Sequence, residues 1–293
     1  AINGGTTKTC YLNAPSVAIN TGNPLDMSIA QNGPIMEGIR DVGACESTPM
    51  GDMLSFDGQN DGVYGNAINT GGDYFTLELM VKPSTSSDPL AYLIYNGIPG
   101  VNGYGLAIDP STNEVLLEIG GSPLESTSYL LNPGIWTHLV YTYNMGSIKL
   151  YANGSLEFSF TSSAIAPPTT NFFLGTAENS QHSFGGEMDE VRVWNRELCL
   201  SEIIHHQSCE IHEIMTSLLA NYHFNQGLDA MNNQNFTTLD DSSGFSNNLT
   251  LDNFALNGTT SNWLKGSSIP SFISCTDFLE VENFSTLNNI SCA

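Results

Sequence analysis

The acidic residues between positions 187 and 192 are the first candidates for chemistry in this sequence. The stretch reads Glu187-Met-Asp-Glu-Val-Arg192. If it forms a β-strand, alternation places Glu187 and Asp189 on one face and Glu190 on the other. A retaining glycosidase requires two carboxyl groups about 5–5.5 Å apart, one as nucleophile and one as acid. The pattern offers no such partner for Glu187, so we predict that the protein is not an enzyme.

The histidines and serines do not form a known catalytic or zinc-binding motif. The zinc motif H-E-x-x-H is absent, because His212-Glu213 has no second histidine at the required spacing. The G-x-S-x-G turn that presents a nucleophilic serine is also absent. We therefore interpret all six histidines as structural or solvated: His138, His182, His205, His206, His212 and His223.

Tyrosine and asparagine side chains in or beside predicted loops are candidates for ligand binding. Sugars stack on exposed aromatic faces, and loops at the rim of a β-sandwich are where this architecture places ligands. The alternative is that these tyrosines are ordinary rim residues. Trp136 and Trp194 lie on predicted core strands, so we expect both to be buried. The candidates are Tyr95, Asn96, Asn102, Tyr104, Asp109 and Tyr129.

The six cysteines fall into three local pairs, which predicts disulfide bonds. Six cysteines allow 15 connectivities, so the pairing is open, and free thiols are the alternative. A C-x-x-C metal motif is absent. Disulfides and the composition favour a secreted protein, and we expect the numbering to begin at the mature chain. The predicted pairs are Cys10 with Cys45, Cys199 with Cys209, and Cys275 with Cys292.

Composition excludes several classes of partner. The chain has 30 acidic and 7 basic residues and a formal net charge of −23. Nucleic-acid binding requires a Lys/Arg surface, and anionic membranes attract basic segments, so both partners are excluded. No apolar run approaches the roughly 18 residues that a membrane-spanning helix needs. With 40% hydrophobic and only 13% charged residues, the chain has the composition of a turn-rich extracellular β protein.

Short β-prone segments separated by turns fill residues 53–194. Several alternate between apolar and polar residues, as expected for strands with one buried face. Asn153-Gly154 lies between two of them and predicts a hairpin with a type I′ turn. One short helix is predicted from Glu197 to about Ser208. We therefore predict an all-β central domain over 51–265, with an N-terminal extension (1–50) and a β-prone C-terminal tail (266–293).

Five regions together resemble a known family. Four of them are similar to strands of the laminin-G-like branch of the concanavalin A-like lectin/glucanase superfamily: 54–63, 75–83, 136–154 and 184–194. Segments between 222 and 263 are similar to an extension found in surface proteins of the Bacteroidetes. The resemblance implies a two-sheet antiparallel jelly-roll sandwich. β-Glucanases of the superfamily carry Glu-x-Asp-x-x-Glu, and here Arg192 lies near the place of the last glutamate.

The resemblance also implies a calcium ion. Family members often hold one Ca²⁺ where the opening and closing strands meet. Ca²⁺ takes six to eight oxygen ligands, and the turn 57–62 is rich in carboxylates and carbonyls. We therefore predict a Ca²⁺ site formed by Asp57, Asn60, Asp61 and Asp189. The alternative is that Asp57 forms an Asx turn and that Asp189 accepts hydrogen bonds from backbone amides.

Two functions fit these observations. The first is a non-enzymatic secreted or cell-surface lectin-like module that binds a glycan or a surface protein, with Ca²⁺ fixing its loops. The second is a structural or adhesive subunit that assembles with copies of itself into an extracellular fibre through its terminal segments. The low lysine content, four residues in the whole chain, favours the second function, because soluble sandwiches usually protect their edge strands with lysine.

Overall fold

The structure is a computed structural model, and it describes residues 50–270 except 85, 87, 163–165 and 178–181. The predicted N-terminal extension and the four cysteines at 10, 45, 275 and 292 lie outside the described residues. The predicted boundary at residue 265 falls inside a strand, because β16 runs over Asn262–Pro270. No helix in the described part of the chain is both long and apolar enough to cross a membrane.

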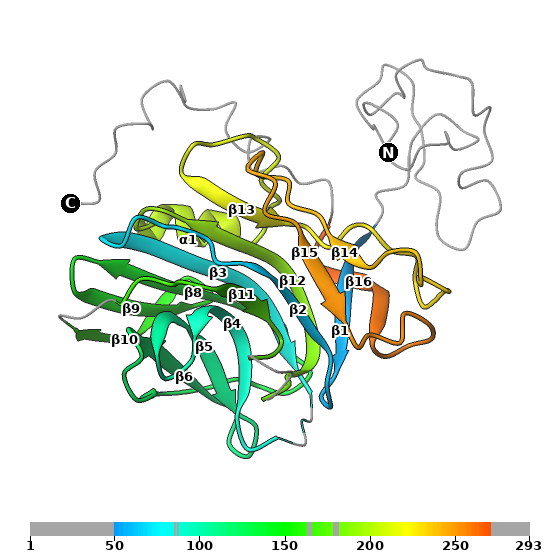
Figure 1. Ribbon diagram of the computed structural model, residues 1–293, viewed down its shortest axis with the longest axis horizontal. Helices are drawn as coiled ribbons and strands as arrows, with labels where there is room; N and C mark the ends of the chain where they lie inside the picture. The colour runs from blue at the N-terminus through cyan, green and yellow to red at the C-terminus, as the bar shows by residue number, and fades with distance from the viewer. Residues whose placement is uncertain (1–49, 85, 87, 163–165, 178–181, 271–293) are drawn as a thin grey trace, which may run out of the picture. The chain divides into compact units, whose positions relative to one another are not determined.

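Two antiparallel sheets of eight strands each form a sandwich (Figure 1). The first sheet contains, in spatial order, β10 (Ser155–Thr161), β9 (Ser147–Ala152), β8 (Thr137–Asn144), β3 (Tyr74–Pro83), β12 (Gly185–Trp194), β1 (Met50–Asp57) and β16, and β13 (Leu218–Tyr222) also pairs with β12. The second contains β14 (Thr238–Leu239), β15 (Leu249–Asp252), β2 (Gly62–Asn66), β11 (Asn171–Leu174), β4 (Ala91–Ile98), β5 (Asn102–Asp109), β6 (Glu114–Ile119) and β7 (Glu125–Leu130). The predicted all-β jelly-roll sandwich is confirmed.

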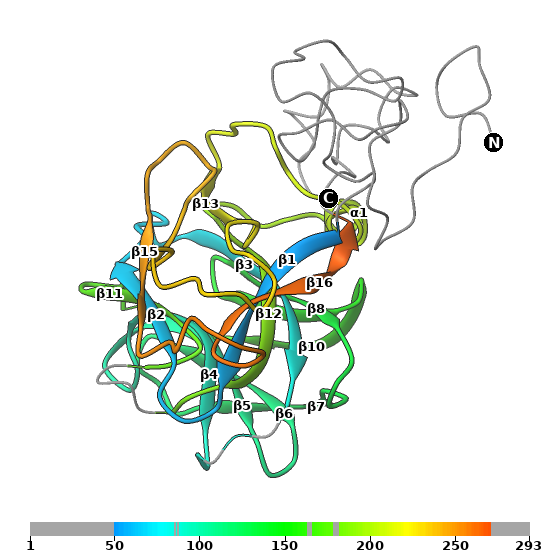
Figure 2. The same cartoon turned by 90° about the vertical axis from the view of Figure 1, so that its right-hand side faces the viewer.

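Strands from the two ends of the described chain lie beside each other in the first sheet. β1 is placed between β12 and β16 (Figure 2). β12 uses its other edge to pair with β3, so the long closing strand is central in the sheet. This arrangement brings residues 50–57, 185–194 and 262–270 together, as expected for the opening and closing strands of the domain.

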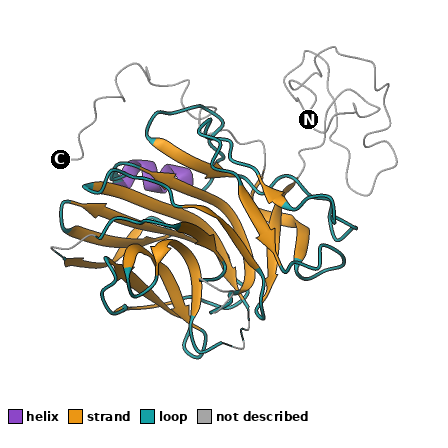
Figure 3. Cartoon of the chain, in the orientation of Figure 1, coloured by secondary structure: helices purple, strands orange, loops and turns teal. Residues whose placement is uncertain are grey.

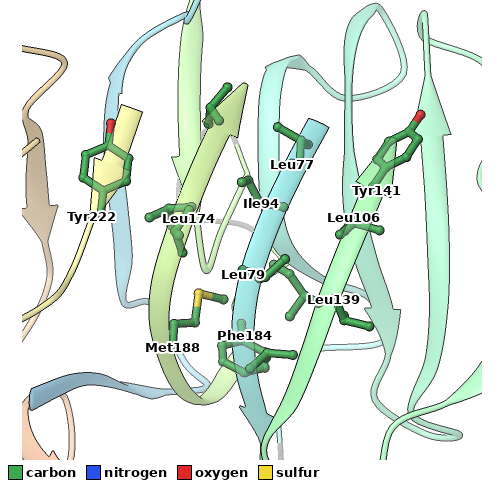
Figure 4. Packing of buried hydrophobic residues seen from close by; sticks show 14 of the residues in the cluster. Leu77, Leu79, Ile94, Leu106, Leu139, Tyr141, Leu174, Phe184, Met188 and Tyr222 are labelled. Carbon is green, nitrogen blue, oxygen red and sulfur yellow. The ribbon is translucent and has the colours of Figure 1, made fainter. Parts of the chain in front are cut away.

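Alternation along the strands builds the core between the sheets. On β3, Phe75 and Leu79 point inward and are fully buried in the main apolar cluster, whereas Glu78 faces the outer side. β8 pairs with β3 in register, so Leu139 lies opposite Leu79. The core residues labelled in Figure 4 come from both sheets: Leu77, Leu79, Ile94, Leu106, Leu139, Tyr141, Leu174, Phe184, Met188 and Tyr222.

The predicted Asn153-Gly154 hairpin is confirmed. Ala152 of β9 pairs with Ser155 of β10, which leaves two residues in the turn. Asn153 has φ 48° and Gly154 has φ 78°, and a type I′ turn requires positive φ at both positions. The turn twists in the same sense as the strands that it joins, so it fixes their register.

The predicted helix is present but shorter. α1 spans Leu200–His206 and is the one helix among the described elements (Figure 3). It begins at Leu200 because Cys199 is the N-cap, with its backbone N–H donating to Glu202 Oε2 at 2.8 Å. Glu197 instead bonds to Lys149 of β9. Ile203 packs with Trp194 in a second apolar cluster, on the outer face of the first sheet.

Candidate functional site

The tyrosines predicted to stack on sugars are inside the protein. Tyr95 and Tyr104 are both fully buried. The Tyr104 ring stacks on Phe75 with ring centroids 3.7 Å apart, and burial raises the pKa of its hydroxyl to about 12. Neither tyrosine offers an exposed face to a ligand, so the prediction that they form an open sugar-binding surface is wrong.

Tyr95 instead belongs to a closed polar network on the outer face of the second sheet. Its hydroxyl donates to Glu118 Oε1 at 2.8 Å, and the Tyr92 hydroxyl donates to Glu118 Oε2 at 2.9 Å. The backbone N–H of Gly100 also donates to Glu118 Oε1. Glu118 is 2% exposed, so this carboxylate holds the loop after β4 against the sheet.

The other predicted ligand residues also have structural partners. Asn96 is buried and its amide bonds to both backbone groups of Ile68. Asn102 accepts from the backbone N–H of Ile98, so these side chains stabilise the β4–β5 hairpin. Strands β4 and β5 extend further than the sequence indicated, which is why expected loop residues lie in strands. The remaining two candidates are Asp109, in an Asx turn with Ser111, and Tyr129, which packs against the core.

Three of the four predicted calcium ligands share one turn after β1. Asp61 is fully buried, and its carboxylate accepts from the Asp57 backbone N–H and from the Ser261 hydroxyl, both at 2.8 Å. Burial raises the pKa of Asp61 to about 7. Asp57 Oδ1 accepts from the backbone N–H of Gln59 at 2.8 Å, as in an Asx turn. The turn places Asp57, Asn60 and Asp61 together.

The fourth predicted calcium ligand does not join this turn. Asp57 lies opposite Gly185, and Asp189 is four residues further along β12. At about 3.3 Å per residue the two positions are roughly 13 Å apart along the strand. Asp189 is 1% exposed and accepts from the backbone N–H of Glu190. The four residues therefore do not form one ligand set, and Ca²⁺ bound by the turn alone stays a prediction.

A β-bulge interrupts β12 at Glu190. Asp189 pairs with Met80 of β3, but the next pair is Arg192 with Glu78, so two residues on β12 lie opposite one on β3. Glu190 has φ 49°, a left-handed conformation that bulges accommodate. The extra residue turns the Glu190 side chain to the outer face. The prediction from alternation that Glu190 faces away from Glu187 is therefore wrong.

The bulge does not create a hydrolytic pair beside Glu187. Glu187 Oε2 lies 3.5 Å from Lys82 Nζ in a partly exposed ion pair. Glu190 is 1% exposed and bonds to Arg192 and to His223. Its carboxylate is thus held inside the protein by Arg192 and His223 and does not reach solvent beside Glu187.

A buried carboxylate organises the outer face of the first sheet. Glu78 has no exposed surface, and its Oε1 accepts from Arg192 Nη1 at 2.8 Å and from His138 Nε2 at 3.0 Å. Its Oε2 accepts from Trp194 Nε1 at 3.0 Å and from His206 Nδ1 at 3.3 Å. Burial opposes ionisation, but the charges of His206 and Arg192 hold the pKa of Glu78 well below its usual value.

A second group of titratable residues lies beyond the bulge, and the sequence did not reveal it. Glu210, His212 and His223 place one potential metal-ligand atom each within 4.8 Å of one another. Burial, followed by the charge of Glu190, raises the pKa of Glu210 to about 8. The spacing E-x-H followed by a distant histidine is too common in sequences to predict such a group. In addition, His223 comes near the other two residues only through the pairing of β13 with β12.

Trp136 is the one tryptophan with exposed surface, and all three tryptophans lie among the described residues. Trp194 and Trp263 are fully buried, whereas Trp136 is half-buried. The prediction that Trp194 is in the core is confirmed, and the same prediction for Trp136 is wrong because Trp136 precedes β8. Lys82 Nζ lies 5.9 Å from the centroid of the Trp136 ring. Trp136, Lys82 and Glu187 thus form a partly exposed polar–aromatic group.

Comparison with known families agrees with the architecture. A family model described as the concanavalin A-like lectin/glucanases superfamily matches residues 57–204, just over half of the chain. The chain belongs to this superfamily. The resemblance found in the sequence is thereby confirmed. No curated protein sequence matches the chain.

Two solved structures similar to this superfamily member have low sequence identity to it. One is a candidate carbohydrate-binding protein from Bacteroides ovatus, with 17% identity and a TM-score of 0.54, covering 74% of this chain and 63% of that one. This chain therefore spans less than two thirds of that protein. Another is the heptameric SAP-like pentraxin from Limulus polyphemus, with 16% identity, a TM-score of 0.46, and coverage of 56% of this chain and 85% of that one.

Proposed function

We propose that this protein is a non-enzymatic, secreted or cell-surface module that binds carbohydrate. Membership of the concanavalin A-like lectin/glucanase superfamily is the observation that carries the proposal. The similar structure from Bacteroides ovatus is itself described as a candidate carbohydrate-binding protein. The engaged carboxylates around Glu187 support binding without hydrolysis, since a glycosidase needs two carboxyl groups poised at the sugar.

The Trp136 group is the surface that we assign to the glycan. A partly exposed indole provides a flat apolar face for a sugar ring. Lys82 and Glu187 lie beside it and are 28% and 20% exposed, so they can donate to and accept from sugar hydroxyls. By contrast, the tyrosines that first suggested a sugar site are enclosed by their own hydrogen bonds.

Retention on immobilised glycans tests the proposal. The full chain should be retained on at least one polysaccharide or array glycan, and Trp136→Ala should lose that retention. Ile135→Ser is the matched control, because Ile135 is the adjacent residue and is 58% exposed. Failure of the wild-type chain to bind any glycan overturns the function. Equal retention of Trp136→Ala overturns only the assigned surface.

Tryptophan fluorescence gives a second readout. Because Trp194 and Trp263 are fully buried, a soluble quencher such as acrylamide should act mainly on Trp136. A bound glycan should protect that emission from quenching. Protection in the Ile135→Ser control, and none in Trp136→Ala, would agree with stacking on the indole.

Three further parts of the prediction belong to this proposal. The first is a bound Ca²⁺ that fixes the turn after β1. Glycan retention measured with and without a chelator shows whether glycan binding depends on Ca²⁺. The second is disulfide pairing of Cys199 with Cys209, supported by their positions on either side of α1. Assembly into a fibre is the alternative function, and light scattering of the purified chain separates a filament from a monomer.

A further inference from the structure

Glu210, His212 and His223 lie where the segment after α1 meets the end of β13. Glu210 and His212 come from residues 207–217, which connect α1 to β13, and His223 directly follows β13. Their potential ligand atoms all lie within 4.8 Å of one another. The two imidazole rings have centroids 5.2 Å apart at an interplanar angle of 40°, so they lie close together without stacking.

The Glu210 carboxylate is the informative member of the group. It is 1% exposed, and its Oε2 is a buried atom that accepts no hydrogen bond. Its other oxygen, Oε1, accepts from Asn225 Nδ2 at 3.0 Å, so the carboxylate is held in one orientation. An unsatisfied buried carboxylate oxygen is costly unless a cation or donor joins it. Oε2 points toward two imidazoles, lying 3.3 Å from His212 Nε2 and 3.9 Å from His223 Nδ1.

These distances match the spacing of ligands around one small cation. Two ligand atoms that are each about 2.1 Å from a tetrahedral zinc ion lie roughly 3.4 Å apart. The distance from Glu210 Oε2 to His212 Nε2, 3.3 Å, is close to this value, and the distance from Glu210 Oε2 to His223 Nδ1, 3.9 Å, is longer. We propose that Glu210, His212 and His223 bind a first-row divalent metal ion of the Zn²⁺ class.

Glu190 lies next to one of the proposed ligands. Turned outward by the bulge in β12, its Oε1 lies 3.0 Å from His223 Nδ1, so it orients the His223 ring, and this hydrogen bond is given up when Nδ1 binds the ion. Two imidazoles and one carboxylate form a ligand set typical of zinc, with a further position left for water. The His212 side chain is 47% exposed, which gives the ion a route from solvent.

Asn221 is the residue that must adjust when the ion binds through His223 Nδ1. Its Nδ2 lies 3.2 Å from His223 Nε2 and donates to the Ile211 carbonyl at 2.7 Å, and its Oδ1 has no hydrogen-bond partner. Binding at Nδ1 moves the imidazole proton to Nε2. Oδ1 of Asn221 can accept that proton only when the carboxamide turns and Nδ2 gives up its hydrogen bond to the Ile211 carbonyl. Bound metal would tie the segment after α1 to β13 and to the bulge in β12.

Metal binding by the full chain tests the proposal directly. After dialysis against a chelator, equilibrium dialysis with Zn²⁺ at neutral pH should give one ion that is lost when this group is altered. His212→Ala should weaken binding at least about tenfold, and it should still fold because His212 is partly exposed. Glu210→Gln, which keeps the size of the side chain and the contact with Asn225, should weaken binding similarly. His205→Ala is the control histidine and should bind as the wild type does.

Two further measurements separate this site from others. Co²⁺ bound at the site should show visible absorption bands that His212→Ala lacks. Ca²⁺ in excess should not displace Zn²⁺, because imidazole nitrogen is a poor ligand for Ca²⁺. Absence of stoichiometric Zn²⁺ binding, or binding that His212→Ala and Glu210→Gln leave unchanged, would overturn the proposal.

Discussion

Replacing Arg192 by Met should strongly destabilise the domain. Arg192 is fully buried and pairs with two buried carboxylates, Glu78 and Glu190. Methionine fills part of the same volume but leaves both carboxylates without their shared cation. Removing one partner of a buried ion pair typically costs about 3–5 kcal/mol. We expect the free energy of unfolding to fall by about that amount, since His223 and His206 compensate only part of the lost charge.

Arg196→Met is the matched control, because it removes the same side chain four residues away. Arg196 pairs with Glu202, but their side chains are 35% and 33% exposed, and exposed ion pairs contribute about 0–1 kcal/mol. Its guanidinium also lies 4.9 Å from the Trp194 ring centroid, an interaction worth about 0.5–1 kcal/mol at such a site. The expected loss is therefore at most about 2 kcal/mol.

Urea unfolding followed by far-UV circular dichroism measures both variants at neutral pH. The double variant Arg192→Met/Glu78→Gln should be less destabilised than the sum of the two single variants, because it removes a buried charge together with its partner. The reasoning is refuted if Arg192→Met costs no more than Arg196→Met. It is also refuted if the double variant is fully additive, since the two residues would then not act as a pair.

Two other perturbations follow from local geometry. Gly154→Ala should lower the free energy of unfolding by about 1–3 kcal/mol, because Gly154 has φ 78° and an added Cβ would lie 2.9 Å from Ile204 Cγ1 of α1. Gly134 is the control: its φ of 73° is similar, but an added Cβ would meet no other atom, so Gly134→Ala should cost less. Equal unfolding midpoints for the two variants would contradict the contact with α1. Ca²⁺ at a hundredfold excess over Kd should raise the free energy of unfolding of the wild-type chain by about 2.7 kcal/mol, and the thermal midpoint should rise with it. Asp57→Asn should abolish this rise. A wild-type midpoint that is the same with and without Ca²⁺ would contradict the calcium prediction.

Local pattern was sufficient to predict an all-β domain, and the family resemblance implied its two sheets. The alternation in β3 assigns Phe75 and Leu79 to the core, and the structure buries both. Asn153-Gly154 specifies its turn through backbone conformation alone, which needs no knowledge of the rest of the chain. These features depend on residues that are close in sequence, and for that reason they could be predicted.

The candidate sites were harder to predict, because burial of a polar side chain depends on distant partners. Tyr95 and Asn96 have the composition of a sugar-binding loop, but β4 continues through them. Glu118, more than twenty residues away, then encloses the Tyr95 hydroxyl. The partial exposure of Trp136 could not be predicted either, since the residue types around it are those of a core strand.

One inserted residue explains why the acids of β12 could not be assigned from alternation. A strand pattern gives each residue a face only while the pairing is regular. The bulge at Glu190 lies where β12 exchanges β1 for β13 as its neighbour on the other edge. Turning Glu190 outward places its carboxylate between Arg192 and His223. An acid that alternation separates from the histidines thereby becomes the link between the buried charges around Glu78 and the proposed metal ligands.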